Sequence, residues 1–509
     1  MSTSDALTHR AGARTAGEWL LGWLDDASDR LSPIVVKEVR QMVRGREFNY
    51  SFGLSLVVGL VVAFLGGADA LNGTRGAGTW IFGWLMSCLS LIGIAVVPLG
   101  AFNALRNERA DQTLNLVTLT ALSARRIVVG KLLAQGVKLA TLFAALSPFV
   151  AMSFLLGGID FISILVSLVT LFIWSLWACA LCFFLSSLSS SRAVSGFIFA
   201  GALFMFLIVF LMGRSAYFAL RYGLLYGGTG VTTYGSSTGS DFWWMVAIST
   251  AFCLMTLANL VLLAENRLSL PTEDRTTALR VGFFAQFLLI VAVAATHAGS
   301  LGATTEKSPI LGVVGGLHLA LVATFAVTED LALSRRVVGQ NKSSSRWRRL
   351  LVMFNPGGGR GAAYVLAQMV LLLAVSRAFA PTPERFRWLL AICSYICFFT
   401  GVPTCIVRLL APARARAAYL RVGVFLFFPL MMIFSELFSY LRTPSRFFDP
   451  AGYSVYEVLD PFRTLANWPM VEKNEWYFLP LGLGLIGLAS YLTLIQMGRR
   501  MYDHVKAAH

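Results

Sequence analysis

Charged side chains are scarce in this sequence. Asp, Glu, Lys and Arg make up 13% of its 509 residues, whereas hydrophobic residues make up 57%. Soluble domains carry about 25% charged residues. This balance indicates an integral membrane protein and excludes a soluble enzyme or a soluble binding module.

The motifs that bind nucleotides or metals are also missing. No Gly-x4-Gly-Lys-Ser/Thr occurs, so the chain has no P-loop for ATP, and its five histidines form no HExxH pair. The glycine-rich segment 355–361 lacks the Lys-Ser/Thr pair and a preceding strand, and it predicts a turn into a membrane span. We therefore expect no catalytic, cofactor or metal site in this chain.

Reactive cysteines and a signal peptide are likewise not expected. All seven cysteines fall in apolar segments. Cys179 and Cys182 have redox-motif spacing but no charged neighbour in the sequence to lower a thiol pKa, which favours packing residues. The first long apolar run starts only after Phe48 and is too long for a secretory signal.

Long apolar runs dominate the chain. A membrane-spanning helix needs about 20 mostly apolar residues, and this criterion predicts an all-α polytopic membrane protein with about twelve transmembrane helices. The predicted spans are 49–68, 80–102, 132–156, 161–188, 194–212, 242–263, 281–298, 310–327, 362–380, 388–408, 421–441 and 476–496.

The positive charges predict the orientation. With both termini in the cytoplasm, most of the 42 Lys and Arg residues lie in cytoplasmic segments, as the positive-inside rule requires. This distribution explains the net charge of +16 better than nucleic-acid binding does, so we expect no nucleic-acid partner. The expected partner of the strongly basic cytoplasmic loop is membrane lipid. Its charges are Arg335, Arg336, Lys342, Arg346, Arg348 and Arg349.

The spans fall into two groups of six. Residues 1–48 are predicted to form cytoplasmic and interfacial helices, 49–280 a six-span domain, and 281–509 an additional six-span membrane region. Two external loops, 213–241 and 442–475, are longer than a hairpin needs.

Ionisable groups at membrane depth are costly and few here. Glu436, in the eleventh predicted span, is the clearest case, and Arg377 near the end of the ninth is its predicted partner in an intramembrane ion pair. A proton-relay chain needs more carboxylates than this, which weakens proton-coupled transport.

Two segments suggest a known family. Pro33-Ile34-Val35-Val36-Lys37-Glu38-Val39-Arg40 follows Ser32, a typical helix N-cap, and predicts an interfacial helix carrying Pro33, Lys37, Glu38 and Arg40. The cytoplasmic loop 103–131 joins the second and third predicted spans. Its distinctive residues are Glu108, Arg109, Gln112, Thr113, Leu114, Leu116, Thr120, Leu122, Ser123, Gly130 and Lys131.

These segments resemble bacterial ABC-2-type permeases, the membrane subunits of one large class of ABC transporters. The first resembles the basic interfacial helix that opens many of these permeases. The second resembles their cytoplasmic element E-R-x-x-(G/Q)-T-L-(E/D)-L-L-x-x-T-P-L-S followed by G-K. Asn115 stands in place of the usual acid and Ala121 in place of the usual proline. A third segment, from Asn266 through Asp274 to Arg280, resembles a loop after the sixth span in some members.

The resemblance implies a six-helix ABC-2-like bundle over 49–280 and a function. The chain would be the permease subunit of an ATP-driven ABC exporter in the bacterial cytoplasmic (inner) membrane, paired as a homodimer or heterodimer. Loop 103–131 would be the coupling helix that docks on a separate cytoplasmic ATPase subunit. ATP and Mg²⁺ would then be bound by that partner, and this chain would not itself be an enzyme.

Two other classes stay open. A twelve-span secondary carrier has the same span count, and an ion gradient without any ATPase would drive it. A polytopic membrane enzyme acting on lipid or glycan would use the acids of 442–475, and turnover by the purified chain alone would identify it.

Overall fold

The computed structural model describes residues 33–71, 77–110, 124–156, 161–188, 195–206 without 197 and 205, 240–268, 274–300 without 275, 307–331, 351–379, 383–410, 417–442 and 455–507. These residues are almost all helical, and no β-strand occurs within them. The chain divides into two compact units, unit 1 (Met1–Leu268) and unit 2 (Ser269–His509). The boundary predicted after residue 280 therefore falls inside the first helix of unit 2.

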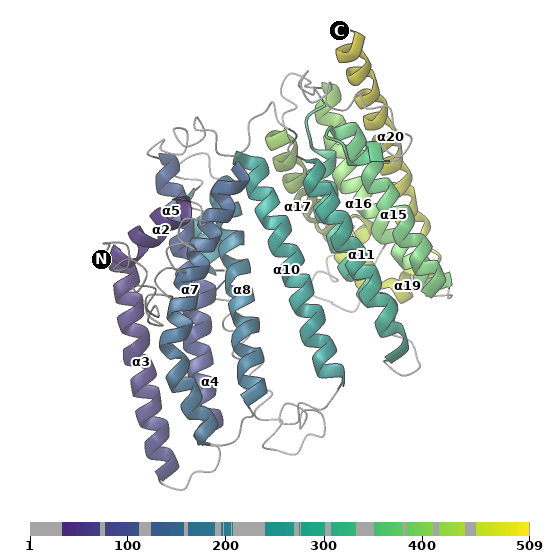
Figure 1. The fold of residues 1–509 in the computed structure, drawn as a ribbon. Helices are drawn as coiled ribbons and strands as arrows, with labels where there is room; N and C mark the ends of the chain where they lie inside the picture. The colour runs from purple at the N-terminus through teal and green to yellow at the C-terminus, as the bar shows by residue number, and fades with distance from the viewer. Residues whose placement is uncertain are drawn as a thin grey trace, which may run out of the picture. The chain divides into compact units, whose positions relative to one another are not determined.

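Unit 1 is a bundle of long apolar helices, and the short helix α2 precedes it (Figure 1). Pro33 is the first residue of α2, where its fixed φ suits a helix and its missing N–H is not needed. In lipid, only a helix satisfies the backbone of a single apolar segment, which is why the long runs fold this way. The helices are α2 (Pro33–Arg44), α3 (Arg46–Leu71), α4 (Ala77–Ser90), the π-helix η2 (Leu91–Val96), α5 (Val97–Ala110), α7 (Ala124–Leu155), α8 (Phe161–Leu188) and α10 (Ser240–Leu268).

One buried cluster ties the helices of unit 1 together. Phe48 of α3, Val97 of α5, Leu139 of α7 and Cys179 of α8 belong to it, and Met42 of α2 packs against it. The thiol at position 179 is thus a packing group, as its apolar surroundings in the sequence predict.

Unit 2 consists of long helices and a group of short ones between α17 and α20. Asp460 begins the short α18, because its carboxylate accepts hydrogen bonds from the backbone N–H groups of Phe462 (2.9 Å) and Arg463 (3.2 Å). The helices are α11 (Thr277–Ser300), α12 (Lys307–Val327), η4 (Leu351–Phe354), α15 (Gly358–Phe379), α16 (Pro383–Leu410), α17 (Ala417–Arg442), η7 (Val455–Leu459), α18 (Pro461–Ala466), α19 (Trp468–Lys473) and α20 (Phe478–Ala507).

Helix α16 lies at the centre of unit 2. Most of its residues are buried, and α12, α15, α17 and α20 pack against it. The hydroxyls of Thr400 on α16 and Tyr491 on α20 are hydrogen-bonded at 2.8 Å, in a contact that is fully buried.

The structure confirms an all-α polytopic membrane architecture. Ten of the described helices are long and apolar enough to cross a membrane. These ten match ten of the predicted spans, and the eighth predicted span corresponds to the shorter apolar helix Gly312–Val327. The second half of the predicted span 194–212 lies outside the described residues, so the count of twelve stays a prediction.

The glycine-rich segment 355–361 is not only a turn. Helix α15 begins at Gly358, inside this run. Other elements approach its first turn too closely for a side chain, which explains why glycines stand there. A Cβ on Gly361 would lie 1.8 Å from the carbonyl oxygen of Ala326, and one on Gly359 would lie 2.8 Å from the Cα of Gly498. The glycines therefore permit close packing of α15 on α12 and α20, in addition to forming the predicted turn into the span.

Replacing Gly361 with alanine is expected to lower the free energy of unfolding by about 1–3 kcal/mol, since the added methyl group overlaps the backbone of α12. Thermal unfolding of the detergent-solubilised chain measures the change. Gly482→Ala in α20 is the matched control, because a Cβ there meets nothing within 4 Å. Equal melting temperatures for the two variants would contradict the close packing of α15.

Candidate functional site

Three elements of unit 1 meet at a buried lysine. The Nζ of Lys131, in the second turn of α7, lies 2.7 Å from Oε1 of Glu38 and 2.6 Å from Oε1 of Glu108. Glu38 comes from α2, and Glu108 from the last turn of α5. The side chain of Lys131 is 8% exposed, and those of Glu38 and Glu108 are 16% and 28% exposed. We call these residues the Lys131 cluster.

The cluster holds its elements together electrostatically. Removing one partner of a buried ion pair leaves an uncompensated charge, which costs about 3–5 kcal/mol. Two carboxylates close to each other would also repel without the ammonium group between them. The interfacial helix α2, the end of α5 and the start of α7 are therefore joined as one piece at this end of unit 1.

The structure brings together only part of the predicted coupling and interfacial set. Glu38 and Glu108 share the Lys131 cluster, whereas Lys37 and Arg40 of α2 are exposed. Arg109 lies in α5, but its side chain, like that of Pro33, is not described. The remaining predicted coupling residues lie outside the described residues. They are Gln112, Thr113, Leu114, Leu116, Thr120 and Ser123.

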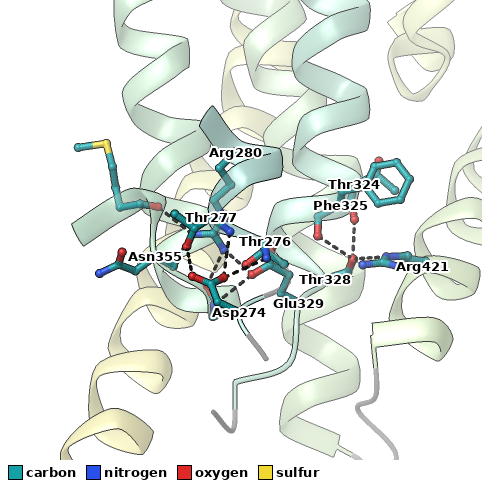
Figure 2. A network of polar contacts seen from close by, with 12 residues as sticks. Asp274, Thr276, Thr277, Arg280, Thr324, Phe325, Thr328, Glu329, Asn355 and Arg421 are labelled. Carbon is teal, nitrogen blue, oxygen red and sulfur yellow. Dashed lines mark hydrogen bonds and ion pairs between the residues drawn. The ribbon is translucent and has the colours of Figure 1, made fainter. Parts of the chain in front are cut away.

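A second polar network lies at one end of unit 2 (Figure 2). The guanidinium group of Arg280, in the first turn of α11, forms an ion pair with the carboxylate of Glu329, directly after α12. It also donates to the backbone carbonyls of Met353 (2.7 Å), Asn355 (2.5 Å) and Gly357 (3.1 Å). The buried Arg280 therefore connects α11, the end of α12 and the entry to α15. We call this the Arg280 network.

Further contacts fix the Arg280 network from both sides. Asp274 caps α11, accepting hydrogen bonds from the N–H groups of Thr276 and Thr277 (Figure 2). The N–H of Gly357 donates to the Glu329 carboxylate at 3.0 Å. Arg408, at the end of α16, donates to the backbone carbonyl of Glu329. Four helices of unit 2 are thus anchored at one end of the bundle.

Sequence reasoning did not assign the Arg280 network to a site. Arg280 and Asp274 lie in the third segment of resemblance, but Glu329, which follows the eighth predicted span, had no predicted role. A usable signal was a glutamate directly after a long apolar run, because an acid at that place needs a partner when it is buried. The identity of that partner was not readable, since two predicted spans, 281–298 and 310–327, separate Arg280 from Glu329 in the sequence.

Unit 2 also contains Glu436, the acid that the sequence predicts to lie at membrane depth. Glu436 of α17 lies 3.2 Å from Nη1 of Arg463 on α18, and the same nitrogen lies 3.0 Å from the buried Glu457. The partner that the structure describes for Glu436 is therefore Arg463. Arg377 is an exposed residue of α15, and its pairing with Glu436 stays a prediction.

The two polar networks and the helical bundles define a class of protein but not an individual function. Together they describe a multi-pass α-helical membrane protein with buried charge clusters at helix ends. No family model, curated protein or solved structure matches the chain.

Proposed function

We propose that this chain is the permease subunit of an ATP-driven ABC transporter, working as an exporter and energised by a separate cytoplasmic ATPase subunit. The observation that supports this best is the Lys131 cluster. Glu38 comes from the segment that resembles the interfacial helix of ABC-2-type permeases, and Glu108 and Lys131 lie near the two ends of the segment that resembles their coupling element. Glu38, Glu108 and Lys131 are far apart in the sequence but in contact in the structure. In that family, the interfacial helix and the coupling element would have to move together at this place.

The geometry of the Lys131 cluster suits the transmission of a movement of the ATPase to the membrane helices. The expected docking segment, 111–123, connects the end of α5 to the start of α7. Because Lys131 joins both helices to α2, a displacement of that segment would move all three elements together instead of bending one of them. ATP binding and hydrolysis in the partner, with its Mg²⁺, would supply this displacement. The membrane helices would then alternate access to the transport path.

The double variant Glu108→Arg with Leu114→Asp tests whether loop 103–131 docks on the ATPase. The tagged full-length chain, purified from its own membranes in mild detergent, is expected to bring down a P-loop ATPase that mass spectrometry identifies. The double variant is expected to recover at least twofold less of it, because it reverses a charge in the junction and removes an apolar docking contact.

Glu384→Arg is the control, because this exposed acid lies in the first turn of α16, at the opposite end of that helix from Arg408 and the Arg280 network. Recovery unchanged by the double variant contradicts docking at 103–131. Substrate movement driven by an ion gradient, with no ATPase recovered from the wild type, would support a secondary carrier instead.

A further inference from the structure

The two units repeat one helical plan. Within each unit the long helices are numbered from first to sixth in chain order. They are α3, α4 with α5, α7, α8, residues 195–206 and α10 in unit 1, and α11, α12, α15, α16, α17 and α20 in unit 2.

The same pairs of helices pack together in both units. In each, the first helix contacts the second and third, and the second contacts the third and fourth. The third contacts the fourth and sixth, and the fourth also contacts the sixth. Two unrelated six-helix bundles are not expected to have the same set of contacting helix pairs.

The fifth helix also occupies the same place in both units. In unit 1, Ala202 and Phe206 share a buried cluster with Phe102 of the second helix and with Ala178 and Cys182 of the fourth. In unit 2, α17 contacts α12 and α16, which are again the second and fourth helices. The fifth helix therefore lies against the second and fourth in each unit.

Long and short connections also follow one another in the same order in both units. The second and third helices are joined by a long segment in both units, 111–123 and 328–357, and so are the fifth and sixth, 207–239 and 443–477. The remaining connections within each unit are short. Long connections at the same two places are the expected result when both units carry the same functional attachments.

Each unit also has a glutamate at the end of its second helix, in an ion pair with a cation near the start of another. In unit 1 the acid is Glu108 and the cation is Lys131 of the third helix. In unit 2 the acid is Glu329 and the cation is Arg280 of the first helix. The cation comes from a different helix, but both pairs anchor the beginning of the long connection from the second helix to the third.

We propose that unit 2 is a second copy of the plan of unit 1 and that its end around the Arg280 network is a second docking surface for the ATPase. This rests on the proposed function. One chain then supplies both halves of the transporter and takes two ATPase subunits, so a second copy of the chain is not needed. Because six spans are predicted before unit 2, its second and third helices are expected to be joined on the same side of the membrane as those of unit 1.

Val352 is the described residue best suited to probe the second docking surface. It lies in η4, near the end of the long connection 328–357, and 38% of its surface is exposed although it is apolar. Its neighbour Met353 accepts a hydrogen bond from Arg280, so η4 is attached to the network. Val352→Asp should therefore disturb a partner contact without removing any bond of the network.

The test counts chains and ATPase subunits by native mass spectrometry of the purified full complex. The wild type is expected to contain one copy of this chain and two ATPase subunits. Val352→Asp alone, and Glu108→Arg with Leu114→Asp alone, should each lower the ratio from two ATPases per chain to one. All three changes together should remove both ATPases, while Glu384→Arg should keep two.

The outcomes separate the two proposals. Two chains with two ATPases, or a Val352→Asp complex that keeps both ATPases, overturns the second docking surface and leaves the proposed function intact. A wild type that carries no ATPase at all overturns the proposed function itself.

Discussion

Replacing Lys131 with methionine is expected to lower the free energy of unfolding of the chain by about 3–5 kcal/mol, the usual cost of breaking a buried ion pair. The Nζ of Lys131 lies 2.7 Å from Oε1 of Glu38 and 2.6 Å from Oε1 of Glu108. The variant leaves two adjacent carboxylates at the junction of α2, α5 and α7. Thermal and denaturant unfolding in detergent measure the loss.

The cause of that loss can be isolated. Combining Lys131→Met with Glu38→Gln and Glu108→Gln removes the charges together, and this triple variant is expected to recover a large part of the lost stability because no unpaired charge remains. Lys37→Gln is the control, since this exposed lysine of α2 should change stability by no more than about 0.5 kcal/mol. A triple variant as unstable as the single one would show that Lys131 acts through packing, not charge.

Replacing Arg280 with methionine is expected to have a similarly large effect in unit 2. The change removes the partner of Glu329 and leaves the carbonyls of Met353 and Asn355 without their donor, which costs about 3–5 kcal/mol for the charge alone. The free energy of unfolding again measures it.

Arg280→Lys distinguishes charge from shape at this position. Lysine keeps the positive charge, but it cannot reach acceptors on both sides with one ammonium group as the forked guanidinium does. An intermediate stability is therefore expected. Arg499→Gln, an exposed arginine of α20, is the control. A lysine variant as stable as the wild type would show that the carbonyl contacts contribute little.

The membrane-spanning helices were predictable from the sequence because apolar run length alone determines them. The π-helix that interrupts the second predicted span was not predictable from the sequence. The π-helix Leu91–Val96 lies in an uninterrupted apolar run, and the close approach that accompanies it is tertiary: a Cβ on Gly93 would lie 2.3 Å from Oγ of Ser175. Hydropathy contains no information about such a contact between helices.

The candidate site was predictable only as separate pieces. Glu38, Glu108 and Lys131 each belonged to a segment of resemblance, but their contact spans 93 residues of sequence and depends on how α2 packs on α7. The partner of Glu436 shows the same limit. Arg463 reaches Glu436 because the segment between α17 and α20 forms the short helix α18, and no apolar run in the sequence predicts that helix.

The central position of α16 also constrains how the chain is assembled in the membrane. Helix α16 is synthesised before α17 and α20, so its polar groups enter the bilayer before the helices that cover them. Before α20 is inserted, the hydroxyl of Thr400 has no hydrogen bond to Tyr491. The surface of α16 at Gly401, against which the Tyr491 ring packs in the folded chain, is then exposed to lipid. Helix α20 therefore completes the burial of a helix made earlier, and a chain that ends before α20 would leave this surface of α16 uncovered.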